Sequence, residues 1–329
     1  MSENPEINLA RRVQQKFELS PPVDILALIK HYARVVILPF PLDIDGISLN
    51  LKIPKKRPTI ILNGRRAETR KRFTLAHELG HVLIPWHCGT IIDDIDALTS
   101  GKDSSYWELE GEANRFAAEL LMPHGWLASV IKSHQNPCAI VEFTTERANV
   151  SMDAAVIRII NALGPGYVYA LVDGDGLVIA SGRSPGTLAS VPEKGTYLEG
   201  DTTFPASDAR WEAPWRDRVW LWWHFATEAK LPALSGTRDW RQILDIILND
   251  INLSPIETIK IKQTINGIIG YVNGIIARRS HGSTPETLYA ASMQRFDSRS
   301  LEDPILRECV YHREFPIFLA TRVQAFFEN

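Results

Sequence analysis

Two histidines one helical turn apart are the residues of this chain whose spacing most directly suggests chemistry. His77, Glu78 and His81 form a His-Glu-x-x-His pattern inside the apolar, helix-forming run that starts at Arg72. Residues four positions apart on a helix project from one face, so both imidazoles would reach a single ion. Imidazole nitrogens suit zinc, and Glu78 would reach a water on that metal without binding the metal itself. We therefore predict that His77 and His81 bind zinc and that Glu78 is a catalytic base.

An ordinary amphipathic helix with two surface histidines is the competing interpretation of this motif. Apolar residues surround the pair, namely Leu75, Ala76, Leu79, Val82 and Leu83. They indicate that the histidines face a protein interior, where a buried imidazole needs a partner that a metal would supply. Gly80 is unfavourable inside a helix by about 1 kcal/mol relative to alanine. A glycine at this position predicts close approach by another backbone or by a substrate.

A zinc protease needs a third ligand, and the best candidate lies between Glu108 and Pro123. This run reads as a second helix that ends at Pro123, with Glu110 and Asn114 on one stripe. We predict that Glu110 completes the site from a helix packed against the first. Asn114 would accept a hydrogen bond from the far nitrogen of a ligand histidine and so fix its tautomer. Glu108 and Glu112 compete for the ligand role, but we expect both to be solvated helix surface.

The two motifs together resemble the ImmA/IrrE-type metallopeptidases of bacteria and phages. The resemblance rests on the runs from Arg72 to His81 and from Glu110 to Pro123, and it covers about the first half of the chain. It implies an α+β protein with a thermolysin-like (zincin) core of helices around a small mixed sheet. Members of this family are zinc-dependent peptidases that typically cleave helix-turn-helix transcriptional repressors.

Carried over to this sequence, the resemblance implies His77, His81 and Glu110 as Zn²⁺ ligands and Glu78 as the general base. Asn114 falls where related zinc peptidases often carry an aspartate, and there this chain departs from the family pattern.

Two-domain peptidases of this type without an attached DNA-binding helix-turn-helix resemble the CapP-like peptidases of CBASS antiviral operons. That likeness implies a partner repressor that is cleaved after DNA damage, with single-stranded DNA as the activating signal. The competing class is a non-catalytic ligand- or DNA-sensing regulatory module whose zinc site is structural or blocked. A toxin–antitoxin partner that acts by binding alone is a third interpretation.

A strand just before the metal helix is the predicted substrate-binding element. In thermolysin-like cores an edge strand beside the metal binds a peptide by strand addition. Residues 59–63 read as a strand that ends at the strong turn signal Asn63-Gly64. The substrate-strand candidates are Ile60, Ile61, Leu62 and Asn63. A plain sheet strand is the competing interpretation.

Cys88 follows the second histidine closely and suggests a means of control. A thiolate is an excellent zinc ligand, so a Cys88 that folds back would occupy the open fourth position as an inhibitory ligand. A small buried core residue is the competing interpretation, and the sequence favours it. His87 is a weaker candidate for the same blocking role.

Length and composition indicate an ordinary globular protein with two domains. The chain has 329 residues, a net charge of -3, 45% hydrophobic and 23% charged residues. Its three scattered cysteines argue against a disulfide framework, and neither a signal peptide nor an apolar run of the ~20 residues that span a bilayer is evident. We expect a cytoplasmic bacterial protein that binds no membrane. The break at Gly164-Pro165-Gly166 predicts a metallopeptidase domain over 1–163 and a sensory α+β domain over 164–329, with a last helix from about 304 to 327.

Two clusters of basic and aromatic residues bear on the choice of partner. Nine basic residues stand against one acid between Lys52 and Arg72, which predicts either a dipolar solvated surface or a rim that attracts phosphates or an acidic peptide. Five of the nine tryptophans lie between Trp211 and Trp223, among three arginines. Such a segment can stack nucleic-acid bases. We favour instead an aromatic core strand, because the alternation from Val219 to Trp223 is poor and fits burial on both faces.

Overall fold

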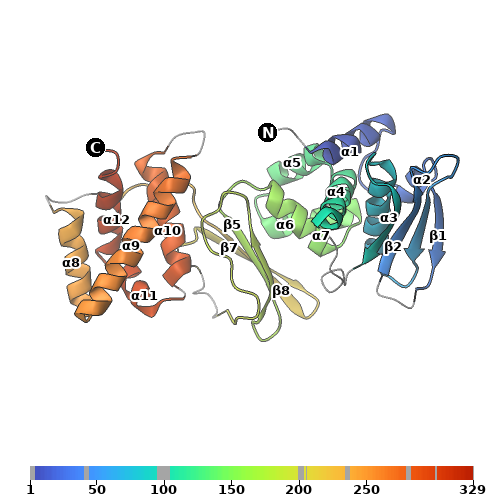
Figure 1. The fold of residues 1–329 in the computed structure, drawn as a ribbon. Helices are drawn as coiled ribbons and strands as arrows, with labels where there is room; N and C mark the ends of the chain where they lie inside the picture. Colours follow the sequence, from blue (N-terminus) through green and yellow to red (C-terminus); the bar gives the residue numbers. More distant parts are fainter. Residues whose placement is uncertain are drawn as a thin grey trace. The chain divides into compact units, whose positions relative to one another are not determined.

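The chain folds into two compact units, of which one ends at Ala162 and the other begins at Leu163 (Figure 1). The computed structural model describes residues 4–40, 44–94, 104–198, 204, 206–233, 238–278, 283–300 and 302–328. Each unit contains helices and a sheet, so the predicted α+β class is confirmed. Within these ranges, no helix combines the length and the apolar character that crossing a bilayer requires.

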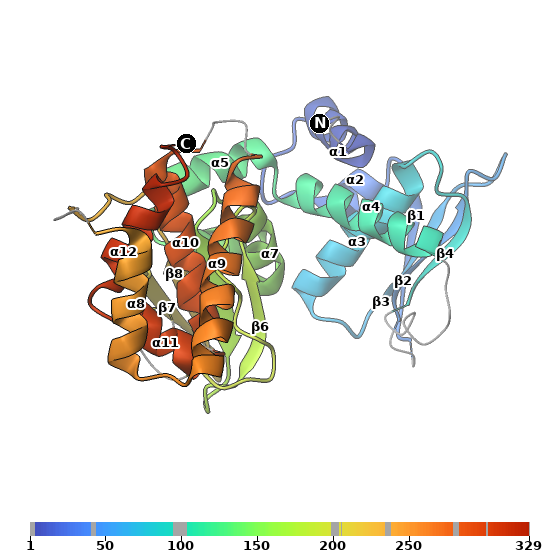
Figure 2. The same cartoon turned by 60° about the vertical axis from the view of Figure 1, so that its left-hand side comes forward.

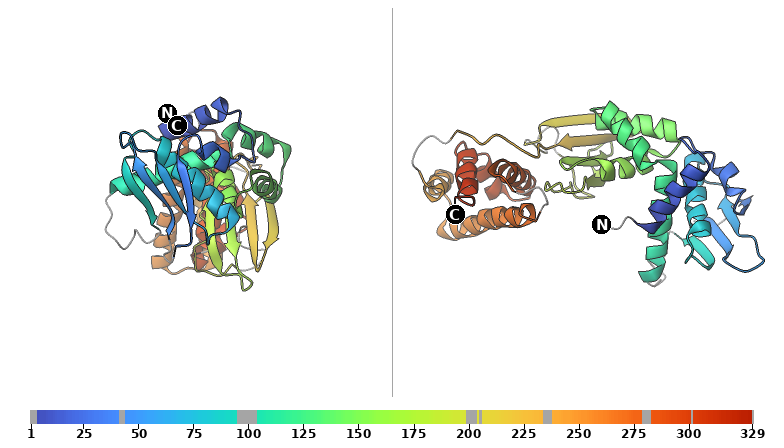
Figure 3. Two further views of the ribbon diagram at one scale, coloured as in Figure 1. Left: turned by 90° about the vertical axis from the view of Figure 1, so that its right-hand side faces the viewer. Right: turned by 90° about the horizontal axis from the view of Figure 1, so that it is seen from above.

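A mixed four-stranded sheet lies in the N-terminal unit, with the strand order β1-β3-β2-β4 (Figure 3, left). The strands are β1 (Arg34–Leu38), β2 (Ile44–Leu51), β3 (Thr59–Asn63) and β4 (Gly89–Asp94). β1 and β3 run parallel, whereas β2 is antiparallel to both β3 and β4. The small mixed sheet that the resemblance implied is therefore present.

Seven described helices accompany this sheet. They are α1 (Pro5–Lys16), α2 (Ile25–Ile29), α3 (Glu68–Leu83), α4 (Ser104–Leu121), α5 (His124–Ser133), α6 (Pro137–Ala148) and α7 (Met152–Ala162). α3 packs against β2 and β3 and also against α4, which in turn packs against α1. Because α3 is covered from two sides, it buries every residue from Thr74 to Val82 rather than a single stripe.

Prolines end the two helices that matter for the site. Pro85 follows Ile84, which has the extended conformation that a residue before proline prefers, so α3 stops there. α4 stops at Leu121, two residues before Pro123, as the sequence predicts. The chain therefore turns sharply after α3. Trp86, His87 and Cys88 lie in this turn, and β4 begins directly after it at Gly89.

The C-terminal unit combines an antiparallel sheet with a set of helices (Figure 2). The strand order is β6-β5-β8-β7, formed by β5 (Tyr167–Val172), β6 (Val178–Arg183), β7 (Ala209–Trp215) and β8 (Arg218–His224). The helices are α8 (Trp240–Ile251), α9 (Pro255–Ile276), α10 (Pro285–Ser300), α11 (Pro304–Val310) and α12 (Phe315–Gln324). Trp220, Trp222 and Trp223 of β8 are buried, so the core interpretation is confirmed for this strand, whereas Trp211 and Trp215 of β7 are only half-buried.

The single helix expected from about 304 to 327 is two helices instead. α11 ends at Val310 and α12 begins at Phe315. Pro316 lies in the first turn of α12, where a backbone N–H has no partner within the helix, so its missing N–H breaks no hydrogen bond there. In the interior of one continuous helix, the same position would need an N–H donor that proline lacks. The prediction of one helix was therefore wrong.

A buried carboxylate on α10 bonds to two other segments of the C-terminal unit. Asp297 is 1% exposed, and its oxygens accept hydrogen bonds from the Ala206 backbone N–H at 3.2 Å and from the Tyr311 hydroxyl at 3.3 Å. Burial raises the pKa of Asp297 from 3.8 to about 6, although both hydrogen bonds oppose the rise.

This raised pKa predicts that Asp297 makes the C-terminal unit less stable as the pH rises. The native state binds the Asp297 proton more tightly than the unfolded state, so the stabilisation is present below pH 3.8 and is lost as the pH rises through about 6. We expect Asp297→Asn to raise the free energy of unfolding at pH 7 by about 1–3 kcal/mol and to flatten its pH dependence. Denaturant unfolding followed by tryptophan fluorescence measures this. Asp217→Asn, at an exposed turn residue, is the control, and an Asp297→Asn variant no more stable than the control contradicts the prediction.

Candidate metal centre

α3 and α4 approach so closely that side chains from both meet in a buried space. A Cβ atom on Gly80 of α3 would lie 3.2 Å from Phe116 Cδ1 and 3.3 Å from Ala113 Cα, both of α4. The prediction that Gly80 marks the approach of another backbone is confirmed. His77 and His81, on the same helix, are 3% and 0% exposed.

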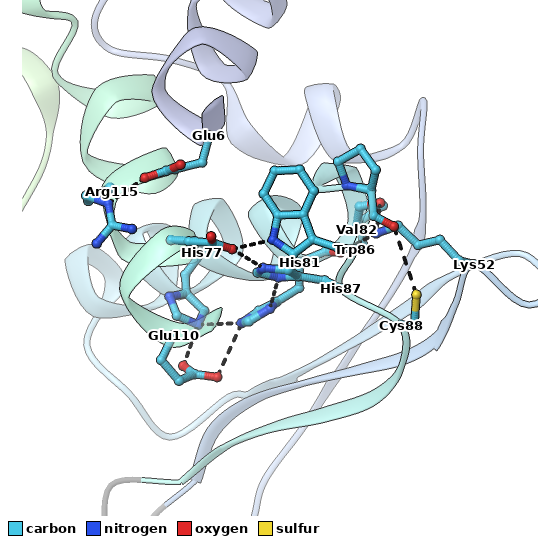
Figure 4. Close-up of polar contacts among 12 residues, drawn as sticks. Glu6, Lys52, His77, His81, Val82, Trp86, His87, Cys88, Glu110 and Arg115 are labelled. Carbon is cyan, nitrogen blue, oxygen red and sulfur yellow. Dashed lines mark hydrogen bonds and ion pairs between the residues drawn. The ribbon is translucent and has the colours of Figure 1, made fainter. Parts of the chain in front are cut away.

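Glu110 of α4 meets both histidines of α3 (Figure 4). Its Oε2 lies 3.1 Å from His77 Nε2, and its Oε1 lies 3.5 Å from His81 Nε2. The two Nε2 atoms are 2.9 Å apart. One ligand atom from each of the three residues lies within 4.8 Å of the others, so the structure brings the predicted set together.

The second ring nitrogen of each histidine meets a partner that determines where its proton lies. His77 Nδ1 is 3.0 Å from Asn114 Oδ1, an acceptor, so His77 carries its proton on Nδ1. His81 Nδ1 is 2.7 Å from His87 Nδ1 and can donate to it in the same way. A cation among the three residues would take the lone pairs of both Nε2 atoms and leave both ring protons on Nδ1, facing these partners. Without a cation, the two Nε2 atoms lie 2.9 Å apart, at hydrogen-bonding distance, so one of them carries a proton.

Burial and charge keep these groups in the protonation states that bind a metal. Burial lowers the pKa of His81 to about 4, and this outweighs the opposing effect of Glu110. Burial also raises the pKa of Glu110, but the imidazoles of His77 and His81 at hydrogen-bonding distance outweigh it and lower that pKa to about 2. At neutral pH, His81 is therefore neutral and Glu110 is ionised, as metal ligands must be.

The donor set fits a zinc ion. Glu110 is 7% exposed, and its Oε1 has no hydrogen-bond donor within the part of the chain that the structure describes. Two imidazole nitrogens and one carboxylate oxygen are a combination that zinc uses in catalytic sites, with a fourth position left open. The three residues therefore fit a metal that would bind between α3 and α4.

Comparison with known families supports this interpretation. Residues 31–159 match the model of the IrrE N-terminal-like domain, a peptidase family. The N-terminal unit carries an IrrE N-terminal-like domain. The matched segment includes α3 and α4 and hence all three residues of the metal centre. The resemblance to ImmA/IrrE-type peptidases is confirmed.

Other comparisons add little about function. No curated protein matches the chain. A solved structure described as a Mycobacterium tuberculosis transcriptional regulator is similar, with 15% identity and a TM-score of 0.42, over 71% of this chain and 92% of that one. A likeness this weak supports no statement about activity.

Strand β2 of the IrrE N-terminal-like domain holds the carboxylate of Glu78. Glu78 is 1% exposed, and its Oε2 accepts a hydrogen bond from Ser48 Oγ at 2.5 Å. A Cβ atom on Gly46 would collide with Glu78 Oε1, so glycine at this position leaves room for the carboxylate where it lies. Gly46 and Ser48 lie two positions apart on one face of the strand. The sequence interpretation missed both, although a glycine within a strand pattern was a usable signal.

The prediction that residues 59–63, which form β3, bind the substrate by strand addition is wrong. β3 pairs with β1 on one side and with β2 on the other, so its backbone hydrogen bonds are used within the sheet. Ile60 and Leu62 are buried, and Ile61 is paired with Val36 of β1 and with Ile47 of β2. The side-chain amide of Asn63 donates a hydrogen bond to the Ile44 carbonyl at 2.8 Å. Because β3 lies inside the sheet, a peptide cannot add to it.

Cys88 does not join the cluster in this structure. The thiol is exposed, and its sulfur lies 3.9 Å from the carbonyl oxygen of Pro85. The interpretation of Cys88 as a buried core residue is therefore wrong, and a thiolate at the fourth metal position stays a prediction without a contact here. None of the three cysteines forms a disulfide.

Glu112 and His87 differ from what the sequence predicted. The side chain of Glu112 is only 13% exposed, whereas Glu108 is exposed as expected. Glu112 Oε2 accepts a hydrogen bond from Trp86 Nε1 at 2.6 Å, and it lies 2.8 Å from His87 Nε2. His87 bonds to His81 rather than to the open side of the cluster, so its predicted blocking role has no support in these contacts.

Proposed function

We propose that the IrrE N-terminal-like domain is a zinc-dependent endopeptidase. His77, His81 and Glu110 would hold the metal, and Glu78 would act as the general base. The observation that carries this proposal is the convergence of two imidazole nitrogens and one carboxylate in a buried space between α3 and α4. Two histidines and a glutamate are a ligand set that catalytic zinc sites use.

Each side chain has a defined task in peptide hydrolysis. A zinc ion held by these three residues would supply Lewis acidity, which would lower the pKa of a water towards about 7 and polarise a peptide carbonyl. Glu78 accepts the proton of the attacking water and returns it to the leaving amine. Ser48 donates a hydrogen bond to Glu78 Oε2 and so orients the carboxylate for that transfer.

A strand at the edge of the sheet would bind the substrate peptide. Within the described residues, β1 and β4 are the two edge strands. β4 begins directly after the turn that follows α3, so it is the edge strand that follows the metal helix directly in the sequence. A peptide added to β4 would form main-chain hydrogen bonds with it, whatever its sequence.

The proposed substrate is a helix-turn-helix transcriptional repressor in a bacterial cytoplasm, cleaved to induce a response to DNA damage or phage. The family resemblance supports this choice. The basic run adds little support for a DNA signal, because six of its nine cations bind within the protein. Arg66 and Arg70 pair with Asp45, Lys71 pairs with Glu68, and Lys52, Arg57 and Arg72 donate to backbone carbonyls. The other three, Lys55, Lys56 and Arg65, are exposed.

Replacing the proposed base separates metal binding from catalysis. We expect Glu78→Gln to retain zinc but to lose cleavage of a candidate helix-turn-helix repressor that the wild type cleaves, because glutamine cannot accept the proton. Glu68→Gln, at an exposed position of the same helix, should cleave normally. Gel analysis of the repressor and metal analysis of the enzyme measure the two properties. Cleavage by Glu78→Gln at the wild-type rate contradicts the role of Glu78, and a zinc-loaded wild type without activity favours the regulatory module.

The proposed trigger is tested in the same cleavage reaction. Single-stranded DNA should accelerate cleavage of the repressor, and double-stranded DNA of the same sequence is the control. A rate that is unchanged across several lengths of single-stranded DNA contradicts this trigger and leaves the peptidase proposal intact.

A further inference from the structure

A buried histidine outside the metal cluster uses both of its ring nitrogens. His87 is 0% exposed and lies in the turn between α3 and β4. Its Nδ1 is 2.7 Å from His81 Nδ1, and its Nε2 is 2.8 Å from Glu112 Oε2. These contacts connect a carboxylate of α4 to the far side of a proposed zinc ligand, and Figure 4 shows the contact between His87 and His81. None of the peptidase roles above requires this connection.

We propose that His87 and Glu112 are positioning residues that orient His81 for the metal, so that metal affinity depends on a carboxylate that does not touch the metal. This inference rests on the metal centre of the proposed function. We call the connected side chains the His81–His87–Glu112 chain.

The proton positions along this chain follow from its two ends. A His81 that gives its Nε2 lone pair to a metal carries its proton on Nδ1 and donates it to His87 Nδ1. His87 must then be neutral, with its proton on Nε2, where it donates to Glu112. The opposite tautomer of His87 would place two hydrogens between the rings and leave the carboxylate without this donor. Glu112 therefore selects the tautomer of His87, and His87 selects that of His81.

The contacts of Glu112 show that it is fixed in place. Its Oε2 also accepts the Trp86 Nε1 hydrogen bond at 2.6 Å, so two donors hold one carboxylate oxygen. Glu108, one turn earlier on the same helix, is exposed. Two glutamates of one helix thus differ sharply in environment, which provides a matched pair for an experiment.

The backbone of His81 is fixed as well, and the other histidine is held differently. Lys52 Nζ donates hydrogen bonds to the carbonyl oxygens of His81 at 2.7 Å and of Val82 at 2.9 Å. His77 depends on the neutral amide of Asn114, an exposed residue. A buried, charge-terminated chain orients a ring more firmly than an exposed amide does, because charge-assisted hydrogen bonds are stronger and buried ones compete less with water.

The test compares Glu112→Gln with Glu108→Gln in the full chain. Zinc affinity is measured by competition with a chromophoric chelator, and thermal unfolding is measured on the metal-free proteins. We expect Glu112→Gln to weaken zinc binding by about 10- to 100-fold, the range found for residues that hydrogen-bond to metal ligands, and Glu108→Gln to bind like the wild type. The Co²⁺-loaded Glu112→Gln protein should show a shifted visible spectrum.

Equal zinc affinities and Co²⁺ spectra for the two variants overturn the inference, even if Glu112→Gln unfolds at a lower temperature, because that combination shows a purely structural role. A wild type that binds neither zinc nor Co²⁺ overturns the proposed metal centre itself, and the inference with it.

A measurement on the zinc-loaded wild type keeps the inference testable if Glu112→Gln does not fold. Nitrogen-15 NMR of the imidazoles should place the His81 proton on Nδ1 and the His87 proton on Nε2. A His87 proton on Nδ1 overturns the inference.

Discussion

Close packing of α3 against α4 is the constraint on which the site depends. Gly80 lets the α4 backbone approach, and this approach brings Glu110 to the two histidines of α3. The three side chains are held together because both helices pack against other parts of the unit. The packing of the two helices thus holds a set of potential metal ligands in place.

Different elements hold the ligands and the proposed base. α4 supplies Glu110 and the partner of His77, whereas β2 supplies the space and the hydrogen bond for Glu78. The turn after α3 supplies His87, which bonds to His81 from the side opposite its metal-binding nitrogen. A site assembled from two helices, a strand and a turn allows the metal and the base to be perturbed separately.

Local patterns predicted the parts of this site that lie on single helices. The spacing of His77 and His81, and the stripe that joins Glu110 to Asn114, depend only on helical geometry. The order of strands does not follow from such patterns, and the local pattern of residues 59–63 does not show that β3 lies inside the sheet. The partnership of His87 with Glu112 depends on a turn induced by Pro85, and on a contact between segments far apart in sequence. Charge alone suggested that Glu112 was solvated, because nothing local shows which helix face is covered.

X-ray absorption spectroscopy of the zinc-loaded protein tests the central claim most directly. The account predicts a first shell of nitrogen and oxygen atoms at about 2.0–2.2 Å, with the outer scattering of two imidazoles. A sulfur atom at about 2.3 Å would place a cysteine on the metal and contradict a centre made of His77, His81 and Glu110 with an open fourth position. A protein that retains no zinc would contradict the metal centre altogether.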